Sequence, residues 1–161
     1  MAEQYPPKWE GETTVEIKTL TPQQVWALIS DFGSLDKVLP HLDKCSIVEG
    51  TPGEPGLTRC CESSLFSGGT QVQYAYEKLV KIDPSEMSLS YEITENNAGF
   101  KYYFSTMKLF PINGGDDGNI GTKFVWSFVC DPLDGFTQQV FCEAIQGLAQ
   151  GMVKKLEGNA S

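Results

Sequence analysis

The most regular pattern of the chain lies over residues 132–157, where apolar side chains recur at spacings of three and four. This spacing places them in one broad stripe along a long α-helix. Asp131 or Asp134 can cap the start of the helix, and Gly158 can end it. A lone helix cannot bury such a stripe, so we expect a sheet to cover it. The stripe consists of Phe136, Val140, Phe141, Ala144, Ile145, Leu148, Ala149, Met152, Val153 and Leu156.

Most of the chain before this helix alternates between apolar and polar residues, as β-strands with one solvent-facing side do. The first strand is predicted over residues 9–20. Six more follow, separated by segments rich in Gly, Pro, Asn, Asp and Ser that favour turns. These strands are predicted over residues 45–49, 57–66, 70–82, 86–94, 100–110 and 120–130.

Two short helices are predicted between the first and second strands. Residues 21–24 (TPQQ) supply an N-cap, a first-turn proline and a capping-box glutamine, and residues 31–40 permit a second helix that ends at a proline. The element order predicts an α+β fold: a seven-stranded curved antiparallel sheet that grips a long C-terminal helix around a central cavity. We expect a flexible leader over 1–8, one domain over 9–158 and a tail over 159–161.

The predicted turns determine which strand positions lie opposite each other. If residues 67–69 (SGG) form a three-residue hairpin loop, Arg59 falls opposite Glu77. If residues 83–85 (DPS) form a similar loop, Glu77 falls opposite Tyr91. A loop of the other parity would turn its strand over and reverse its two faces.

The same register predicts that the odd-numbered side of the sheet faces inward, because the even-numbered side carries more polar residues. After the loop over 113–119 the parity changes, and the last strand directs Ile120, Phe124, Trp126 and Phe128 toward the helix. The predicted inner face of the earlier strands consists of Leu57, Arg59, Cys61, Leu65, Ala75, Glu77, Leu79, Met87, Leu89, Tyr91, Ile93, Tyr103, Met107 and Leu109.

Composition and charge limit the classes of partner that the protein can have. The chain has 161 residues and a net charge of −9, without a run of Lys or Arg. A nucleic-acid partner is therefore not expected, since a binding protein needs a basic surface to neutralise phosphates. The charge would also repel an anionic membrane surface. No stretch has the length and apolar character of a membrane span, and no apolar leader follows Met1.

Cysteine and histidine give no sign of a metal site. The five cysteines lack the spacings of zinc sites and of disulfide frameworks, which predicts free thiols in a reducing compartment such as the cytoplasm. The single histidine, His41, follows a proline in a predicted loop, and no catalytic or metal role is expected for it. We predict neither a metal nor a cofactor.

Three polar side chains, Arg59, Glu77 and Tyr103, share the predicted inner face with apolar residues. They could be a cross-strand ion pair and a satisfied tyrosine that hold the register of a dry core. Alternatively, they could converge on an apolar-walled cavity between sheet and helix. Burying an ion pair is costly without excellent geometry or a use, which favours the cavity. There Arg59 would pair with an anionic ligand oxygen, Glu77 would exchange a proton, and Tyr103 would donate a hydrogen bond.

Several motifs resemble those of the plant lachrymatory factor synthases, from about Lys8 to Glu157 with few gaps. More broadly, the chain resembles the plant helix-grip superfamily of birch-pollen allergens, START-type lipid carriers, polyketide cyclase-like proteins and abscisic-acid receptors. The motifs are KWEG at 8–11, PQQVWALISDF at 22–32, VEG at 48–50, GLTR at 56–59, EKLV at 77–80, MSLSY at 87–91 and WSF at 126–128.

The resemblance implies roles for the three inward polar residues. The catalytic arginine, glutamate and tyrosine of the synthases fall at Arg59, Glu77 and Tyr103. These enzymes convert a small propenyl sulfenic acid into a thial S-oxide by proton transfer, without a cofactor. The walls differ at Leu148, which stands where the onion enzyme has a bulky aromatic residue, and along Ser63–Thr70. The substrate therefore stays open.

The resemblance to abscisic-acid receptors does not extend to their functional motifs. Those receptors carry a Ser-Gly-Leu-Pro-Ala gate and a His-Arg-Leu latch, whereas this chain has Leu65-Phe66-Ser67-Gly68-Gly69 and Asn97-Ala98-Gly99-Phe100 in these regions. The lysine that binds the hormone carboxylate falls at Asp43, which would repel it. A hormone-receptor role is not expected.

Two classes of function remain: a binding or carrier protein for a small hydrophobic or amphipathic molecule, and a cofactor-free isomerase. Arg59, Glu77 and Tyr103 would orient the polar end of the ligand in the first class and carry out the proton transfer in the second. No protein partner is evident. The residues predicted to line the cavity are Cys61, Leu79, Leu89, Tyr91, Met107, Trp126, Leu148 and Met152.

Overall fold

The computed structural model describes residues 8–63, 72–113 and 120–159. The predicted turn at 67–69, and most of the predicted leader and tail, lie outside this range. The elements are β1 (Trp9–Ile17), α1 (Pro22–Ile29), the 3-10 helix η1 (Phe32–Lys37), β2 (Lys44–Glu49), β3 (Thr58–Ser63), β4 (Gln73–Asp83), β5 (Ser88–Asn96), β6 (Tyr103–Ile112), β7 (Gly121–Cys130) and α2 (Gln138–Asn159).

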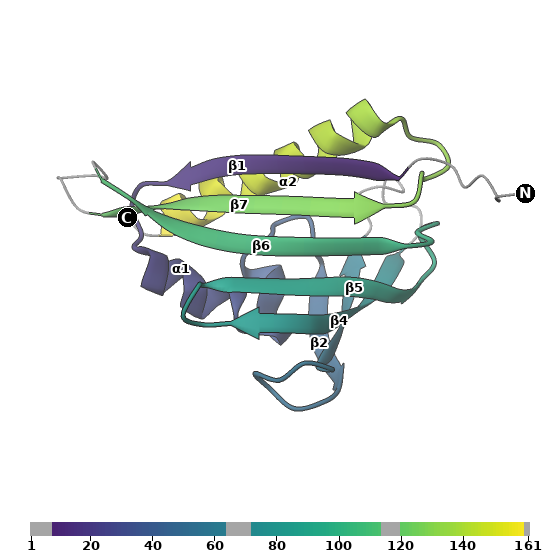
Figure 1. The fold of residues 1–161 in the computed structure, drawn as a ribbon, viewed down its shortest axis with the longest axis horizontal. Coiled ribbons are helices and arrows are strands. Elements are labelled where there is room, and N and C mark those ends of the chain that lie inside the picture. Colours follow the sequence, from purple (N-terminus) through teal and green to yellow (C-terminus); the bar gives the residue numbers. More distant parts are fainter. Residues whose placement is uncertain (1–7, 64–71, 114–119, 160–161) are drawn as a thin grey trace, which may run out of the picture.

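The strands form one antiparallel sheet in the order β1-β7-β6-β5-β4-β3-β2. The helices α2 and α1 both lie behind the strands in the view of Figure 1, so they cover the same face of the sheet. This arrangement confirms the predicted α+β fold, in which a seven-stranded sheet grips the C-terminal helix. No helix in the described part of the chain is both long and apolar enough to cross a membrane.

The helix α1 begins as its sequence predicts. The Thr21 hydroxyl accepts a hydrogen bond from the Gln24 backbone N–H at 3.2 Å, and the Gln24 side-chain oxygen accepts one from the Thr21 N–H at 2.8 Å. This reciprocal capping box satisfies two donors that the first turn would otherwise leave unpaired. Val25 and Ile29 on the inner side of α1 are fully buried.

The helix α2 begins later than predicted, at Gln138 rather than near residue 132. Gly135 adopts a φ of 88°, a left-handed conformation that interrupts a right-handed helix. The cap is therefore Thr137, whose hydroxyl accepts a hydrogen bond from the Val140 N–H at 3.1 Å, and not Asp131 or Asp134. At the other end the helix continues through Gly158 to Asn159.

The strand register confirms one predicted pair and corrects another. Arg59 lies opposite Glu77 across β3 and β4, as predicted. Glu77 lies opposite Ile93, not Tyr91. The β4–β5 turn has four residues between Asp83 and Ser88, one more than predicted, and an even-length loop alone would reverse the face of β5. A bulge between Leu79 and Lys81 restores the parity.

The inner face of the sheet contains most of the predicted residues. Tyr91 and Tyr103 are 2% and 4% exposed, and Phe124, Trp126 and Phe128 of β7 are also buried against the helical side. Ile120 precedes β7 and is 49% exposed, so its predicted inward position is wrong. Leu65 lies outside the described residues.

Candidate functional site

A cavity of about 200 Å³ lies between the sheet and α2. Most of its walls are aliphatic and aromatic side chains, which come from the strands β4 to β7, from α2 and the segment before it, and from η1 and the segment after it. Among the lining residues in the described part of the chain, Glu77 is the one carboxylate. The residues that line it are Leu35, Leu39, His41, Leu42, Cys61, Ser63, Gln73, Tyr74, Ala75, Glu77, Tyr91, Ile93, Ala98, Phe100, Tyr103, Trp126, Leu133, Phe136, Phe141, Ala144, Ile145 and Leu148.

Half of the residues predicted as cavity walls occupy these positions. Cys61, Tyr91, Trp126 and Leu148 line the cavity, together with the predicted polar residues Glu77 and Tyr103. The other four walls were predicted wrongly, because they are buried in the core and do not line the cavity. These four are Leu79, Leu89, Met107 and Met152.

The helix α1 covers one end of the inner face of the sheet, where it contacts β6 and β7. The start of this helix, at Thr21 and Pro22, lies beside Met87 and Leu109 at the end of the sheet where β5 begins and β6 approaches its end. Side chains at that end, such as Leu89 on β5, pack into the buried core that includes α1. The cavity lies away from α1, between the sheet, α2 and the segment formed by η1 and the residues after it.

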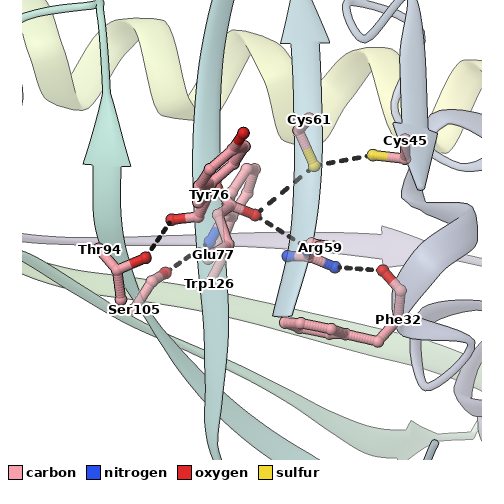
Figure 2. Close-up of polar contacts among 9 residues, drawn as sticks. All are labelled: Phe32, Cys45, Arg59, Cys61, Tyr76, Glu77, Thr94, Ser105 and Trp126. Atoms are coloured by element: carbon pink, nitrogen blue, oxygen red, sulfur yellow. Dashed lines mark hydrogen bonds and ion pairs between the residues drawn. The ribbon is translucent and has the colours of Figure 1, made fainter. Parts of the chain in front are cut away.

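Glu77 and Arg59 form a tight ion pair at the border of the cavity. The Arg59 Nε donates to Glu77 Oε1 at 2.8 Å, and Figure 2 shows these two groups meeting between β3 and β4. The Arg59 side chain is 1% exposed, whereas that of Glu77 is 13% exposed. The carboxylate therefore faces the cavity, and the guanidinium lies behind it, outside the lining.

The surroundings of Arg59 hold its guanidinium in place. Its Nη1 donates to the Phe32 carbonyl oxygen at 3.0 Å, and its central carbon lies 3.8 Å from the Phe32 ring centre and 4.9 Å from that of Tyr91. The buried Nη2 has no hydrogen-bond partner among the described residues. Burial is the largest single influence and lowers the pKa of Arg59, but Glu77, Cys61, Tyr91 and Cys45 together outweigh it, so the pKa is raised. Arg59 stays charged.

Two tyrosines bring hydroxyl groups to the same part of the cavity. Burial raises the pKa of Tyr91 and of Tyr103, and nearby groups (Glu77 for Tyr91, Tyr91 for Tyr103) raise it further, whereas the side chain of Ser105 acts in the opposite direction. Both phenols are therefore protonated at neutral pH and can donate a hydrogen bond. Ser105 is itself held by Trp126, whose indole N–H donates to its hydroxyl at 2.8 Å (Figure 2).

His41 and Ser63 belong to the cavity wall. The sequence predicted no role for His41 and placed Ser63 only at the start of a wall segment, Ser63–Thr70. The Ser63 hydroxyl donates to the His41 carbonyl oxygen at 2.7 Å, which connects the end of β3 to the segment after η1. Burial lowers the pKa of His41 to about 4, and the charge of Asp43 opposes this only in part. The imidazole lining the cavity is therefore neutral at pH 7.

The remaining unpredicted wall residues come from η1 and the segment after it, from β4 and β5, from the segment before β6, and from α2 and the segment before it. Phe136, Phe141, Ala144 and Ile145 belong to the apolar stripe identified in the sequence, which indicates burial but not which void a side chain faces. Phe100 packs edge-on to Tyr103, with ring centres 5.3 Å apart. No group of three His, Cys, Asp or Glu within residues 8–63, 72–113 and 120–159 could hold a metal ion.

This arrangement can bind an apolar molecule and exchange a proton with it. The cavity offers one carboxylate as acceptor or base, phenol donors from Tyr91 and Tyr103, and a neutral imidazole. A carboxylate directed into an apolar cavity disfavours anions, so the geometry suits a ligand that is neutral and donates a hydrogen bond.

Comparison with known proteins agrees with the fold. The chain is 26% identical over 132 residues to the abscisic acid receptor PYL7 of Arabidopsis thaliana, a match that covers 82% of this chain and 59% of the receptor. The chain thus spans less than two thirds of the receptor's length.

Solved structures with the same fold have low sequence identity. The major latex-like protein 151 of Panax ginseng has a TM-score of 0.72 at 14% identity, covering 96% of this chain and 99% of that one. XoxI of Bacillus cereus has a TM-score of 0.72 at 22% identity, covering 94% of each chain. Ara h 8.0201 has a TM-score of 0.66 at 20% identity, covering 95% and 97%. These identities establish the fold alone.

The family itself is established by its sequence profile, described as polyketide cyclase / dehydrase and lipid transport, which matches residues 8–160. With the gripped helix and the cavity behind it, the chain belongs to the polyketide cyclase / dehydrase and lipid transport family.

Proposed function

We propose that the protein binds a small, mostly apolar, uncharged molecule in the cavity, with the polar end of that molecule at Glu77. One observation carries this proposal: an apolar cavity contains a single carboxylate among its described lining residues, and a fully buried arginine holds that carboxylate. Burying an ion pair costs more than packing apolar residues of the same size, so its presence beside a void favours a use in binding.

The size of the cavity limits the ligand. At about 200 Å³ it is smaller than the roughly 300–1,000 Å³ of most drug-sized ligand sites, so a compact ligand fits best. The charges argue against abscisic acid, the hormone for which the receptor PYL7 is named, as the ligand. Glu77 lines the cavity and Asp43 acts on His41 in its wall, so a carboxylate ligand would meet negative charge. A neutral alcohol, carbonyl compound or similar molecule meets the requirements.

The compartment is part of the same proposal. All five cysteines are free thiols, which supports a reducing compartment such as the cytoplasm. The ligand would then be a small molecule that enters the protein from the aqueous phase.

Titration with naphthol, a compact aromatic alcohol, tests the binding proposal. Isothermal titration calorimetry should give one molecule bound per chain. Leu148→Trp fills the cavity and should weaken binding at least about tenfold, since overfilling a packed site costs about 1–3 kcal/mol. Val140→Trp is the matched control, because Val140 lies on the same helix and is 47% exposed. No binding of naphthol to the folded wild type, or equal effects of the two variants, would contradict the proposal.

A second candidate function is a cofactor-free isomerase of the lachrymatory factor synthase type. The observation that favours it is the placement of a carboxylate and two phenol donors around one apolar space. In such a reaction a proton leaves the sulfenic oxygen of the substrate and a proton is added to a carbon, without loss or gain of atoms. Glu77 would move the proton, Tyr103 would donate to the substrate oxygen, and Arg59 would act as a positioning residue that holds the Glu77 carboxylate in its orientation.

Turnover separates the two candidates. The assay supplies a cysteine sulfoxide with its lyase and follows thial S-oxide by gas chromatography. An isomerase should form product above the enzyme-free background, and Glu77→Gln should lower turnover about a hundredfold while naphthol affinity changes little. Tyr103→Phe and Arg59→Leu test the other two roles. Wild type at background level, with naphthol still bound, would exclude sulfenic-acid isomerisation and leave the binding function.

A further inference from the structure

Two thiols meet in the wall of the cavity beside Glu77. Cys45 on β2 and Cys61 on β3 are directly paired across the two strands, and their sulfur atoms lie 2.7 Å apart. Cys61 lines the cavity, and its sulfur lies 3.8 Å from Glu77 Oε1. Figure 2 shows the resulting chain of contacts from Cys45 through Cys61 to Glu77 and Arg59.

The backbone already meets the requirement for a disulfide at this position. Paired residues on antiparallel strands have Cα atoms about 4.5–5.5 Å apart, which is within the range of about 4.4–6.8 Å that disulfides span. The two side chains also point toward each other, since their sulfurs are in contact. Bond formation therefore requires no rearrangement of β2 and β3.

The two thiols differ in exposure and in acidity. Cys45 is half-buried on the edge strand and open to small solutes, whereas Cys61 is 5% exposed. The hydrogen bond with Cys61 lowers the pKa of Cys45, with help from the charge of Arg59 and against the effect of burial. The same hydrogen bond, together with burial, raises the pKa of Cys61. This asymmetry suits Cys45 to attack an oxidant and Cys61 to form the disulfide with the oxidised Cys45.

We propose that Cys45 and Cys61 are a redox-active pair that a hydroperoxide closes to a cross-strand disulfide, which withdraws the Cys61 thiol from Glu77. The Cys45 thiolate attacks one peroxide oxygen, the O–O bond breaks, and Cys45 becomes a sulfenic acid while the other oxygen leaves as an alcohol or water. The Cys61 sulfur then displaces the hydroxyl group from Cys45 as water and the S–S bond forms. Two thiols are oxidised and one hydroperoxide is reduced by two electrons.

This step affects the cavity because Cys61 loses its S–H. Glu77 Oε1 then no longer accepts a hydrogen bond from that thiol and becomes free to accept one from a ligand. In a reducing compartment, where stable disulfides are rare, such a bond is transient and can regulate binding. This effect on the ligand rests on the proposed binding function, whereas disulfide formation does not.

Mass spectrometry of the full chain tests the disulfide directly. Treatment with one equivalent of hydrogen peroxide should remove two hydrogen atoms from the intact mass, and dithiothreitol should restore them. Trypsin cuts after Lys44 and Arg59, so the bond should link peptides 45–59 and 60–78. Cys45→Ala and Cys61→Ala should abolish the link. Cys60→Ala is the matched control, because Cys60 pairs with Ser46 on the opposite face and its removal should leave the link intact.

Two results would overturn the redox pair. One is a wild type that takes up oxygen at Cys45 without forming the link, and the other is a link that survives in Cys61→Ala and disappears in Cys60→Ala. Naphthol titration tests the effect on the cavity: the oxidised wild type should bind about two- to tenfold more tightly than the reduced form. Equal affinity would overturn the withdrawal of Cys61 from Glu77. Failure of naphthol to bind either form would count against the binding function and leave the mass result standing.

Discussion

The inner face of the sheet has a filled half and a hollow half, although the same strands run through both. Along β5, Leu89 is packed in the core while Tyr91 and Ile93 line the cavity. The same division separates Met152 from Leu148 one turn earlier on α2. Strand alternation and the apolar stripe of α2 direct these side chains inward, and the packing of the helices against the sheet decides which of them are covered. The cavity thus lies beyond the reach of α1, where α2, η1 and the segment after η1 leave a void against the sheet.

The ion pair lies across the border between the two halves, and removing either charge should reveal this. Glu77→Leu leaves the buried guanidinium without its counter-charge and should lower the free energy of unfolding by about 3–5 kcal/mol. Arg59→Met leaves a carboxylate that faces the cavity, where water can solvate it, so the loss should be smaller. Urea denaturation measures both. A larger loss for Arg59→Met would contradict the assignment of the two groups to different halves.

Truncating a leucine in each half compares the filled and hollow halves of the inner face without changing any charge. Leu89 is 1% exposed, and Leu89→Ala should lower the free energy of unfolding by about 2–5 kcal/mol because it opens a void in packed core. Leu148→Ala only widens an existing cavity, and should cost about 1 kcal/mol or less. Thermal and urea denaturation of the two variants give the difference. Equal losses would mean that the cavity is filled in solution.

The hollow half should also give the protein a pH-dependent stability through His41. Its pKa is about 4 in the folded protein, against an ordinary value of 6.5, so the unfolded chain binds the proton more readily. The stabilisation from the neutral imidazole is therefore complete above pH 6.5 and is lost as the pH falls from 6.5 to 4. The maximum loss is about 3 kcal/mol.

Urea denaturation at pH 7 and pH 4 checks this contribution. His41→Gln has no titrating group at the site, and should lose less stability than wild type over this interval. If wild type and His41→Gln follow the same pH dependence, the imidazole titrates in the folded protein as it does in the unfolded chain.

The sequence predicted the faces of the sheet better than it predicted the cavity. Alternation and turn length placed Arg59 opposite Glu77 and Tyr103 on the same side, because these depend on local parity. The pairing of Glu77 with Tyr91 failed for two reasons: the β4–β5 turn is one residue longer than predicted, and nothing in residues 79–81 signals a bulge. The walls assigned to Leu79 and Met107 failed for a different reason. Packed and cavity-lining residues have the same polarity pattern, and only the packing of the helices against the sheet separates them.

The start of α2 also shows that a sequence pattern does not determine the tertiary structure. Its apolar stripe continues upstream to Phe136, so periodicity alone extends the helix too far. The left-handed conformation of Gly135 ends that continuity, and Phe136 instead reaches the cavity from a non-helical segment. A glycine before a helix permits such a conformation but does not require it.

The anchoring of Arg59 in the filled half has an evolutionary consequence. Its guanidinium is fixed by the Phe32 carbonyl and ring, and these contacts belong to the packed core. Substitutions at wall positions such as Ile145 and Leu148 can therefore change the shape of the void while Glu77 keeps its orientation and charge. A protein built in this way can acquire new ligands by small steps, each of which leaves the reactive group and most of the folding energy intact.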